Sequence, residues 1–209
     1  MTPSGPLAEA AAAARRGEAI VLPTDTVYGI GTRPDDPAAT GRIFEAKGRP
    51  RDLELPVLAG STEQARTIAV FDDRAGRLAE RLWPGPLTIV LPRAPAASGW
   101  DLGGDPSTVG VRVPRHPLVL ALLAETGPLA VTSANRSGEP PARDCDGLHG
   151  VFGDAVAVYL CEERPLEGEA SSVIDLAHGP ARILRAGSVA VDTIGRVLGE
   201  QPLDSRPSR

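Results

Sequence analysis

The sequence predicts an α/β domain built around a single sheet. Short apolar runs, several of them closed by glycine or proline, are interspersed along all 209 residues with stretches of good helix formers. Aromatic residues make up only 3% of the chain, so alanine, valine, leucine and isoleucine must build most of the core. A chain of this length can bury one substantial core, and no internal repeat divides it.

The expected elements follow this pattern from the first turn onward. A helix over 7–16 consists of strong helix formers and stops at Gly17, and the apolar strand over 19–22 is closed by Pro23. Residues 94–107 are rich in proline, glycine and alanine and are expected to form a loop. The further helices expected are 37–47, 62–69, 73–82 and 117–125, and the further strands are 55–59, 87–91, 109–113, 129–132, 155–160, 173–176 and 182–184.

The overall composition limits the domain organisation and the function. We expect residues 1–199 to form one domain and the polar residues 200–209, with two prolines, to form a disordered tail. A net charge of -5 argues against a protein that coats nucleic acid through bulk electrostatics, although a local basic patch is compatible with it. Cys145 and Cys161 match no zinc or disulfide framework. Without a signal peptide or an apolar run of about 18 residues, we expect a cytoplasmic protein that does not bind membranes.

Lys47 is the only lysine among the 22 lysine and arginine residues of the chain, and all the others are arginine. It lies at the expected end of the helix over 37–47, and Gly48 separates it from Arg49 and Pro50. An ammonium group is a compact, rotatable charge, unlike the planar fork of arginine, so this lysine suits a tight anionic site. The alternative is a solvated lysine at a helix end, where a cation suits the helix dipole.

Two polar segments directly follow expected strands, where ligand-binding loops usually lie. The segment 24–26, Thr-Asp-Thr, offers two hydroxyls and a carboxylate that could bind a polar ligand. The segment 133–135, Ser-Ala-Asn, offers donors and acceptors suited to a phosphate, a ribose or a base edge. In both segments, local turn or helix-cap hydrogen bonding explains the same residue types.

Arg112 interrupts the apolar strand over 109–113 and needs a partner if it is buried. When Arg112 is considered alone, an ion pair with an acidic side chain explains the residue better than contact with a ligand does. His116, His149 and His178 have no metal-ligand spacing, and we assign them no role. The chain contains no Walker-type loop, GxGxxG, nucleophile elbow or HExxH, so any chemistry on ATP proceeds without those devices.

Six segments, taken together and in this order, resemble the YrdC family of bacterial L-threonylcarbamoyladenylate synthases. The resemblance covers about residues 10–190, and each segment alone is a weak signal. The matching segments are 23–29 (Pro-Thr-Asp-Thr-Val-Tyr-Gly), 47–50 (Lys-Gly-Arg-Pro), 83–88 (Trp-Pro-Gly-Pro-Leu-Thr), 111–117 (Val-Arg-Val-Pro-Arg-His-Pro), 133–138 (Ser-Ala-Asn-Arg-Ser-Gly) and 171–175 (Ser-Ser-Val-Ile-Asp).

The resemblance implies a twisted, open, mixed α/β sheet flanked by helices around a concave basic cleft, in a short, single-domain member. It implies that the amine of L-threonine captures bicarbonate or CO2 as a carbamate, which attacks the α-phosphorus of ATP with Mg²⁺ present. Pyrophosphate leaves, and partner proteins of the threonylcarbamoyl transferase complex pass the threonylcarbamoyl group of the adenylate to an adenosine in tRNA. A weak affinity for tRNA is a further implication.

The resemblance also implies roles for individual residues. Lys47 and Arg49 would be catalytic, facing the triphosphate and the charge that develops at the α-phosphorus. Such catalysis relies on positioning and electrostatics, which agrees with the missing nucleophile motif. No metal-ligating residue is assigned. The threonine-binding residues would be Thr26, Arg112, Val131 and Ser171, and the ATP-binding residues Lys47, Arg49, Thr108, Ser133, Asn135 and Arg185.

The chain departs from the family pattern at Leu53, Leu58 and Pro141. Many members carry lysine or asparagine at the first position and some carry histidine near the second, and a proline cannot donate a hydrogen bond. Two other functions stay open. One is a related carbamoyl-adenylate enzyme with another acceptor, a class usually found in much longer chains. The other is a non-enzymatic RNA-binding module, which the net charge and the scarcity of aromatic side chains disfavour.

Overall fold

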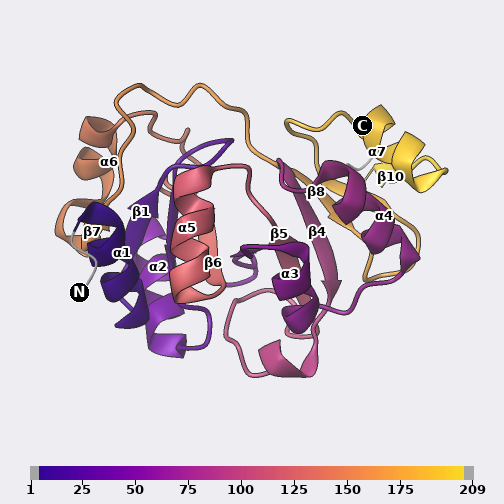
Figure 1. Cartoon of the computed structure of the whole chain (residues 1–209), viewed down its shortest axis with the longest axis horizontal. Coiled ribbons are helices and arrows are strands. Elements are labelled where there is room, and N and C mark those ends of the chain that lie inside the picture. The colour runs from indigo at the N-terminus through magenta and orange to yellow at the C-terminus, as the bar shows by residue number, and fades with distance from the viewer. Residues whose placement is uncertain (1–4, 205–209) are drawn as a thin grey trace.

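The computed structural model describes residues 5–204, whose ten strands form one mixed, open sheet (Figure 1). The strands lie in the order β10-β9-β8-β4-β5-β3-β6-β2-β1-β7, and both parallel and antiparallel neighbours occur. The predicted α/β class is therefore confirmed. The strands are β1 Ile20–Leu22, β2 Gly29–Thr32, β3 Val57–Leu58, β4 Leu87–Pro92, β5 Thr108–Arg112, β6 Leu129–Ser133, β7 Val158–Tyr159, β8 Ser172–Asp175, β9 Arg182–Arg185 and β10 Leu203–Asp204.

Helices flank both halves of this sheet. Figure 1 shows α1, α2 and α5 around the half that contains β1, β2 and β6, and α3, α4 and α7 around the half that contains β4 and β8. The chain crosses between the halves after β7, along the segment 161–170. The helices are α1 Pro6–Arg15, α2 Pro37–Lys47, α3 Thr62–Ile68, α4 Asp73–Leu82, α5 Pro117–Thr126, α6 Cys145–Phe152 and α7 Val191–Leu198, with short 3-10 helices η1 Pro95–Ala97 and η2 Gly153–Ala155.

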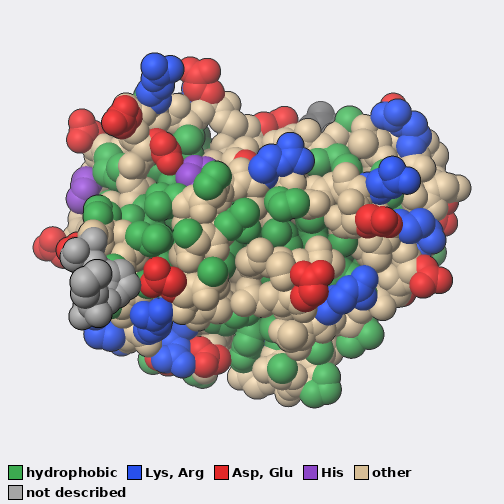
Figure 2. Space-filling view, in the orientation of Figure 1, with side chains coloured by type: hydrophobic (Ala, Val, Ile, Leu, Met, Phe, Trp, Pro, Cys, Tyr) green, Lys and Arg blue, Asp and Glu red, His purple; other side chains and the backbone are tan. Residues whose placement is uncertain are grey.

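Strand β1 shows how the core is built, because its alternate side chains enter two separate apolar clusters. Ile20 and Leu22 pack with the alanines of α1 and the leucines of α5, whereas Val21 packs with Ile43 of α2 in the larger cluster. The sheet is thus covered on both faces in this half. The surface seen in Figure 2 has hydrophobic side chains over its centre and interspersed acidic and basic side chains around its edge.

Most predicted elements are present within one to three residues, and α2 begins and ends as predicted. Sequence patterns did not predict β2, α6 or α7. Strand β2 reads Gly-Ile-Gly-Thr, and glycine is unusual inside a strand. The fold requires it, since a Cβ on Gly31 would lie 2.6 Å from the backbone oxygen of Ala130 in β6. Helix α6 contains two glycines and α7 begins with a β-branched residue, so their helix propensity is low.

The two cysteines correct an expectation from the sequence. Their spacing matched no disulfide framework, yet the structure joins Cys145, at the start of α6, to Cys161, just after β7. The Cα atoms lie 5.8 Å apart, within the range of ordinary disulfides. The fold brings the two elements together, and spacing along the chain carries no information about that proximity.

The predicted tail is partly described. Leu203 and Asp204 form β10, which pairs in parallel with β9, while residues 205–209 lie outside the described residues. Among residues 5–204, no helix is long and apolar enough to cross a membrane.

Candidate active site

A pocket of about 410 Å³ contains eight of the ten predicted site residues. The pocket lies on one face of the sheet at its middle. Its floor consists of residues two apart along each strand, and such residues point to the same face. The intervening residues Ile89, Val109, Val111 and Ile174 enter the larger apolar cluster on the opposite face. The floor consists of Thr88 and Val90 of β4, Thr108, Gly110 and Arg112 of β5, and Val173 and Asp175 of β8. The predicted residues in the pocket are Thr26, Arg49, Thr108, Arg112, Val131, Ser133, Ser171 and Arg185.

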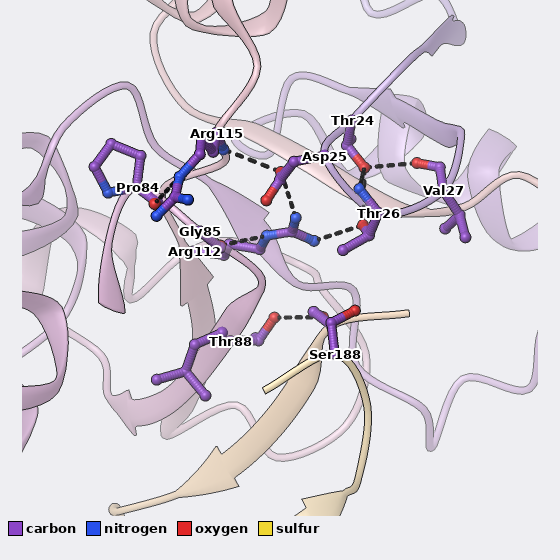
Figure 3. Close-up of polar contacts among 12 residues, drawn as sticks. Thr24, Asp25, Thr26, Val27, Pro84, Gly85, Thr88, Arg112, Arg115 and Ser188 are labelled. Atoms are coloured by element: carbon purple, nitrogen blue, oxygen red, sulfur yellow. Dashed lines mark hydrogen bonds and ion pairs between the residues drawn. The ribbon is translucent and has the colours of Figure 1, made fainter. Parts of the chain in front are cut away.

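Arg112 is buried at the end of β5 and is held by three partners (Figure 3). Its Nε donates to the backbone oxygen of Gly85 at 3.0 Å, Nη1 donates to Oγ1 of Thr26 at 3.0 Å, and Nη2 donates to Oδ1 of Asp25 at 2.6 Å. Burial lowers the pKa of Arg112, and the carboxylate of Asp25 opposes that effect. The predicted ion pair with an acid is confirmed. Because each Nη atom carries two protons, two donors remain for an anionic ligand.

The segment after β1 is rigid through its own hydrogen bonds. Thr24 Oγ1 accepts from the backbone N–H of Thr26 at 3.1 Å and donates to the backbone oxygen of Val27 at 2.6 Å. Asp25 also accepts from the backbone N–H of Arg115 at 3.0 Å, as Figure 3 shows. The turn chemistry expected here is therefore present. It orients Asp25 and Thr26 towards Arg112.

Arg185 and Ser171 line the same pocket and are joined to each other. Arg185 donates from Nε to the backbone oxygen of Ser171 and from Nη2 to its Oγ, each at 2.9 Å. Ser171 Oγ also lies 3.0 Å from Oγ1 of Thr88. Burial lowers the pKa of Arg185, and its positive charge contributes to lowering the pKa of both Arg112 and Arg49. Three guanidinium groups thus face a common space, where an anion would relieve their repulsion.

Arg49 reaches the pocket because α2 ends abruptly at Gly48. Gly48 adopts φ 58°, a left-handed conformation that glycine tolerates without steric cost, and it turns the chain away from the helix axis. Arg49 then donates from Nε to the backbone oxygen of Leu53 at 3.1 Å and from Nη2 to that of Glu54 at 2.9 Å. These bonds hold its guanidinium group beside Arg185.

Lys47 and Asn135 are the two predicted site residues that do not line the pocket. Lys47 is only 2% exposed, and its Nζ donates to the backbone oxygens of Ser133 and Asn135, each at 2.5 Å. Burial, with a contribution from Arg49, lowers the pKa of Lys47 to about 8. The ammonium group therefore lies beneath the 133–135 loop, whose first residue enters the pocket. A direct contact between Lys47 and a ligand stays a prediction.

Several pocket residues were not predicted from the sequence. His178 bonds through Nδ1 to Asp175 at 2.8 Å and through Nε2 to Asp105 at 3.2 Å, and these carboxylates raise its pKa. Glu54 and Leu53 also line the pocket. Period-two alternation along β8 could have identified Asp175, whereas nothing in the sequence places His178 beside Asp105. The pocket lining thus combines three arginines with the acids Asp52, Glu54, Asp105 and Asp175.

No group of three or more histidine, cysteine, aspartate or glutamate residues within residues 5–204 is arranged to hold a metal ion. Leu58 lines the pocket wall as a buried side chain, and Leu53 lies at its rim with 44% of its surface exposed. These two departures from the family pattern therefore place apolar surface in the pocket. Pro141 does not line it.

Comparison with known proteins agrees with this fold and pocket. A family model named Sua5/YciO/YrdC, with the description telomere recombination, matches residues 12–187. A putative threonylcarbamoyl-AMP synthase of Mycobacterium leprae is 44% identical over 197 residues, which cover 94% of this chain and 89% of that protein. The fold and the pocket define an α/β protein with an arginine-lined pocket at the middle of its sheet. The chain belongs to the Sua5/YciO/YrdC family.

Two solved structures support the same assignment. The Pyrococcus abyssi Sua5 protein complexed with L-threonine superimposes with a TM-score of 0.84 at 36% identity, covering 93% of this chain and 57% of that one. Escherichia coli YciO superimposes with a TM-score of 0.83 at 26% identity, covering 90% of this chain and 92% of that one. The second alignment spans nearly the whole of both chains, as expected for the short type of family member.

Proposed function

We propose that this chain is a threonylcarbamoyl-AMP synthase, which forms threonylcarbamoyl-AMP and pyrophosphate from L-threonine, bicarbonate or CO2, and ATP. The observation that carries the proposal is the convergence of Arg49, Arg112 and Arg185 on one pocket that also contains threonine and serine hydroxyls. Such a site binds a carboxylate and phosphates at once. Relatives named threonylcarbamoyl-AMP synthases support the same reaction, and this chain covers 84% of the length of the one from Klebsiella pneumoniae.

The amino-acid end of the pocket lies at Arg112. The free Nη protons of Arg112 bind the carboxylate of threonine, and Thr26 and Ser171 provide hydroxyl groups for its polar atoms. The backbone of Val131 completes this pocket. The threonine amine adds to CO2, loses a proton and becomes a carbamate, whose oxygen then attacks the α-phosphorus of ATP. The oxygen–phosphorus bond to the β-phosphate breaks, and pyrophosphate leaves with that bonding pair.

The phosphate end lies at Arg49 and Arg185. Their positive charges stabilise the negative charge that grows on the α-phosphate and on pyrophosphate, without a covalent intermediate on the protein. Ser133 and Thr108 provide further contacts to ATP, and Lys47 and Asn135 act at the loop that presents Ser133. Mg²⁺ enters with ATP as its counter-ion, because this ion usually binds through substrate phosphates and retained waters.

The product serves tRNA modification. Partner proteins of a threonylcarbamoyl transferase complex transfer the threonylcarbamoyl group to an adenosine of tRNA, so the enzyme acts in the cytoplasm, where tRNA and ATP are available. A weak affinity of this chain for tRNA would bring the enzyme close to its final acceptor. The surface in Figure 2 carries interspersed acids and bases, so such binding would depend on a local patch.

The test is pyrophosphate release by purified protein with ATP and Mg²⁺, with and without L-threonine and bicarbonate, and with the product identified by mass. Release that requires both compounds supports the proposal. Arg185→Ala should lose this release, whereas Arg182→Ala, in the same strand but outside the pocket lining, should keep it. Release with a different acceptor would favour another carbamoyl-adenylate enzyme. A folded protein that releases no pyrophosphate but binds tRNA with a steep salt dependence would favour an RNA-binding module.

A further inference from the structure

His178 is a pocket residue to which the reaction described above gives no role. It follows β8, and its ring joins two carboxylates that also line the pocket. Nδ1 lies 2.8 Å from Oδ2 of Asp175, and Nε2 lies 3.2 Å from Oδ2 of Asp105. An ionised carboxylate accepts hydrogen bonds and cannot donate them, so both ring nitrogens must carry a proton to make these two bonds. The bridging ring is therefore a cation.

This bridge of two carboxylates and one imidazole ring connects two sides of the pocket. Asp175 ends β8 and pairs in register with Val90 of β4, which in turn pairs with Gly110 of β5. These three residues belong to the pocket floor, and β4 separates β8 from β5 in the sheet. Asp105 lies in the loop that leads into β5. His178 therefore connects the loop after β8 with the loop before β5, two segments that flank β4.

Each end of the bridge also has an anchor of its own. Arg74 of α4 donates to the backbone oxygens of Leu176 and Gly179, at 3.1 and 2.8 Å, and so holds the loop after β8 on both sides of the histidine. Oδ1 of Asp105 accepts from the backbone N–H of Ser107 at 2.8 Å and from its hydroxyl group at 2.7 Å. Loss of the imidazole ring should therefore leave both carboxylates in the pocket lining.

The charge of these two carboxylates matters because ATP is a polyanion. Within residues 5–204, the ion pairs of Asp105 and Asp175 are those with His178. Hydrogen bonds from Ser107, with a further contribution from His178, lower the pKa of Asp105 to about 2, so this carboxyl group is ionised throughout the neutral range. Without a counter-ion, the two acids would oppose the attraction between phosphates and the three arginines of the same pocket.

We propose that His178 is the counter-ion of Asp105 and Asp175, and that its positive charge permits the polyphosphate of ATP to bind in this pocket. The inference rests on the proposed use of ATP. His178 acts on the substrate through the electrostatic potential of the pocket and takes no part in bond making, so it is a positioning residue. L-Threonine brings an ammonium and a carboxylate group and has no net charge, so its binding should depend much less on His178.

The proposal predicts that ATP binding weakens as the pH rises through the pKa of His178. The hydrogen bonds to Asp175 and Asp105 raise that pKa, so the charged form persists above the ordinary range of histidine. A neutral ring has one N–H group, so deprotonation leaves one carboxylate without a donor and removes one positive charge from the pocket. Burial lowers the pKa of Lys47 and raises that of Glu54, each to about 8, so both groups change the charge in the same direction at higher pH. The other charged groups around the bridge are Arg74 of α4, Arg182 of β9, which pairs in register with Asp175, and Arg93, which lies 3.5 Å from Glu54.

The experiment measures the Kd of inorganic tripolyphosphate by calorimetry and, in the synthase assay, KM for ATP and for L-threonine. His178→Gln keeps a donor but carries no charge, so at about pH 6 it should weaken tripolyphosphate binding and raise KM for ATP by about five- to tenfold. KM for threonine should change by less than about twofold. The loss of tripolyphosphate affinity should shrink at about 1 M salt, because salt screens the interaction between charges.

Two further variants separate the charge of His178 from a structural role. His178→Arg keeps a cation that does not titrate, so it should retain tight tripolyphosphate binding at pH values where the wild type has lost it. Adding Asp105→Asn to His178→Gln removes the unpaired negative charge and should restore binding to within about twofold of wild type. The asparagine oxygen can still accept from Ser107. His149→Gln, at a histidine outside the pocket lining, is the control and should keep the wild-type pH profile. Ionisation of tripolyphosphate is common to all these proteins, so the differences between their profiles report the protein.

The outcomes separate this inference from the proposed function. Unchanged tripolyphosphate binding and KM for ATP in His178→Gln would overturn the role of His178 alone. Equal increases in KM for ATP and threonine, with no restoration by Asp105→Asn, would also overturn it, because they would indicate a purely structural bridge. A folded wild-type protein without synthase activity would overturn the proposed function, while its tripolyphosphate titration would still decide the role of His178. A wild-type protein that binds neither tripolyphosphate nor ATP would overturn both.

Discussion

The ammonium group of Lys47 donates to the backbone oxygen of Asn135 at 2.5 Å and lies 3.4 Å from its side-chain oxygen. The only lysine of the chain therefore contacts the loop that was expected to bind ATP. Asn135 is itself fixed, since its Nδ2 donates to the backbone oxygens of Arg136 and Glu139. Lys47 thus sets the conformation of this loop whether or not it also contacts a phosphate.

Replacing Lys47 by alanine should abolish adenylate formation while the protein remains folded. The substitution removes a cation near the phosphates and leaves the backbone oxygen of Asn135 without its Lys47 donor, whereas that of Ser133 still accepts from the backbone N–H of Asn135. An unsatisfied buried acceptor costs about 1–3 kcal/mol of stability. Pyrophosphate release and thermal unfolding measure the two effects. Arg42→Ala, on the exposed side of the same helix, is the matched control and should retain activity. Near-normal turnover in Lys47→Ala would show that the residue has no role in the reaction.

Arg112→Lys should raise KM for L-threonine by at least about tenfold. A lysine has one compact ammonium group, which cannot reach Gly85, Thr26 and Asp25 together and still offer two donors to a carboxylate. KM for ATP should change much less, and the melting temperature should fall because Asp25 loses a partner. Arg115→Lys serves as control, since the contact of Arg115 with Asp25 uses the backbone N–H. An unchanged KM for threonine in Arg112→Lys would place the carboxylate elsewhere.

The sequence predicted the fold class because it depends on local patterns, and the resemblance to the family named eight residues that line one pocket. The binding roles of those residues stay predictions. Apolar runs predicted most of the strands. The predicted end of α2 at Lys47 is also correct, and Gly48 follows it in a left-handed conformation. Contacts between distant segments were not predictable in the same way. The position of Lys47 under the 133–135 loop, the approach of His178 to Asp105 and the proximity of Cys145 to Cys161 all arise from tertiary packing. Spacing along the chain carries no information about them.

Serine should be a poorer substrate than threonine, with kcat/KM lower by about 10–200-fold. The two amino acids differ by one methyl group, and such a group in a fitted pocket is worth about 1–3 kcal/mol. The buried side chains of Val131 and Leu58 provide apolar surface in the pocket. Competition between the two amino acids for adenylate formation measures the ratio directly. Equal efficiency would mean that the threonine pocket is wrongly placed.

The disulfide between Cys145 and Cys161 should stabilise the protein when thiols are oxidised. It closes a loop with a sequence separation of 16, for which the loss of chain entropy in the unfolded state amounts to about 3 kcal/mol. Reduction should therefore lower the melting temperature by about 6–12 °C. The double variant Cys145→Ser, Cys161→Ser should melt like the reduced wild type and should not respond to reductant. Titration of free thiols under denaturing, non-reducing conditions checks the bond itself: two free thiols in protein purified without reductant would contradict it.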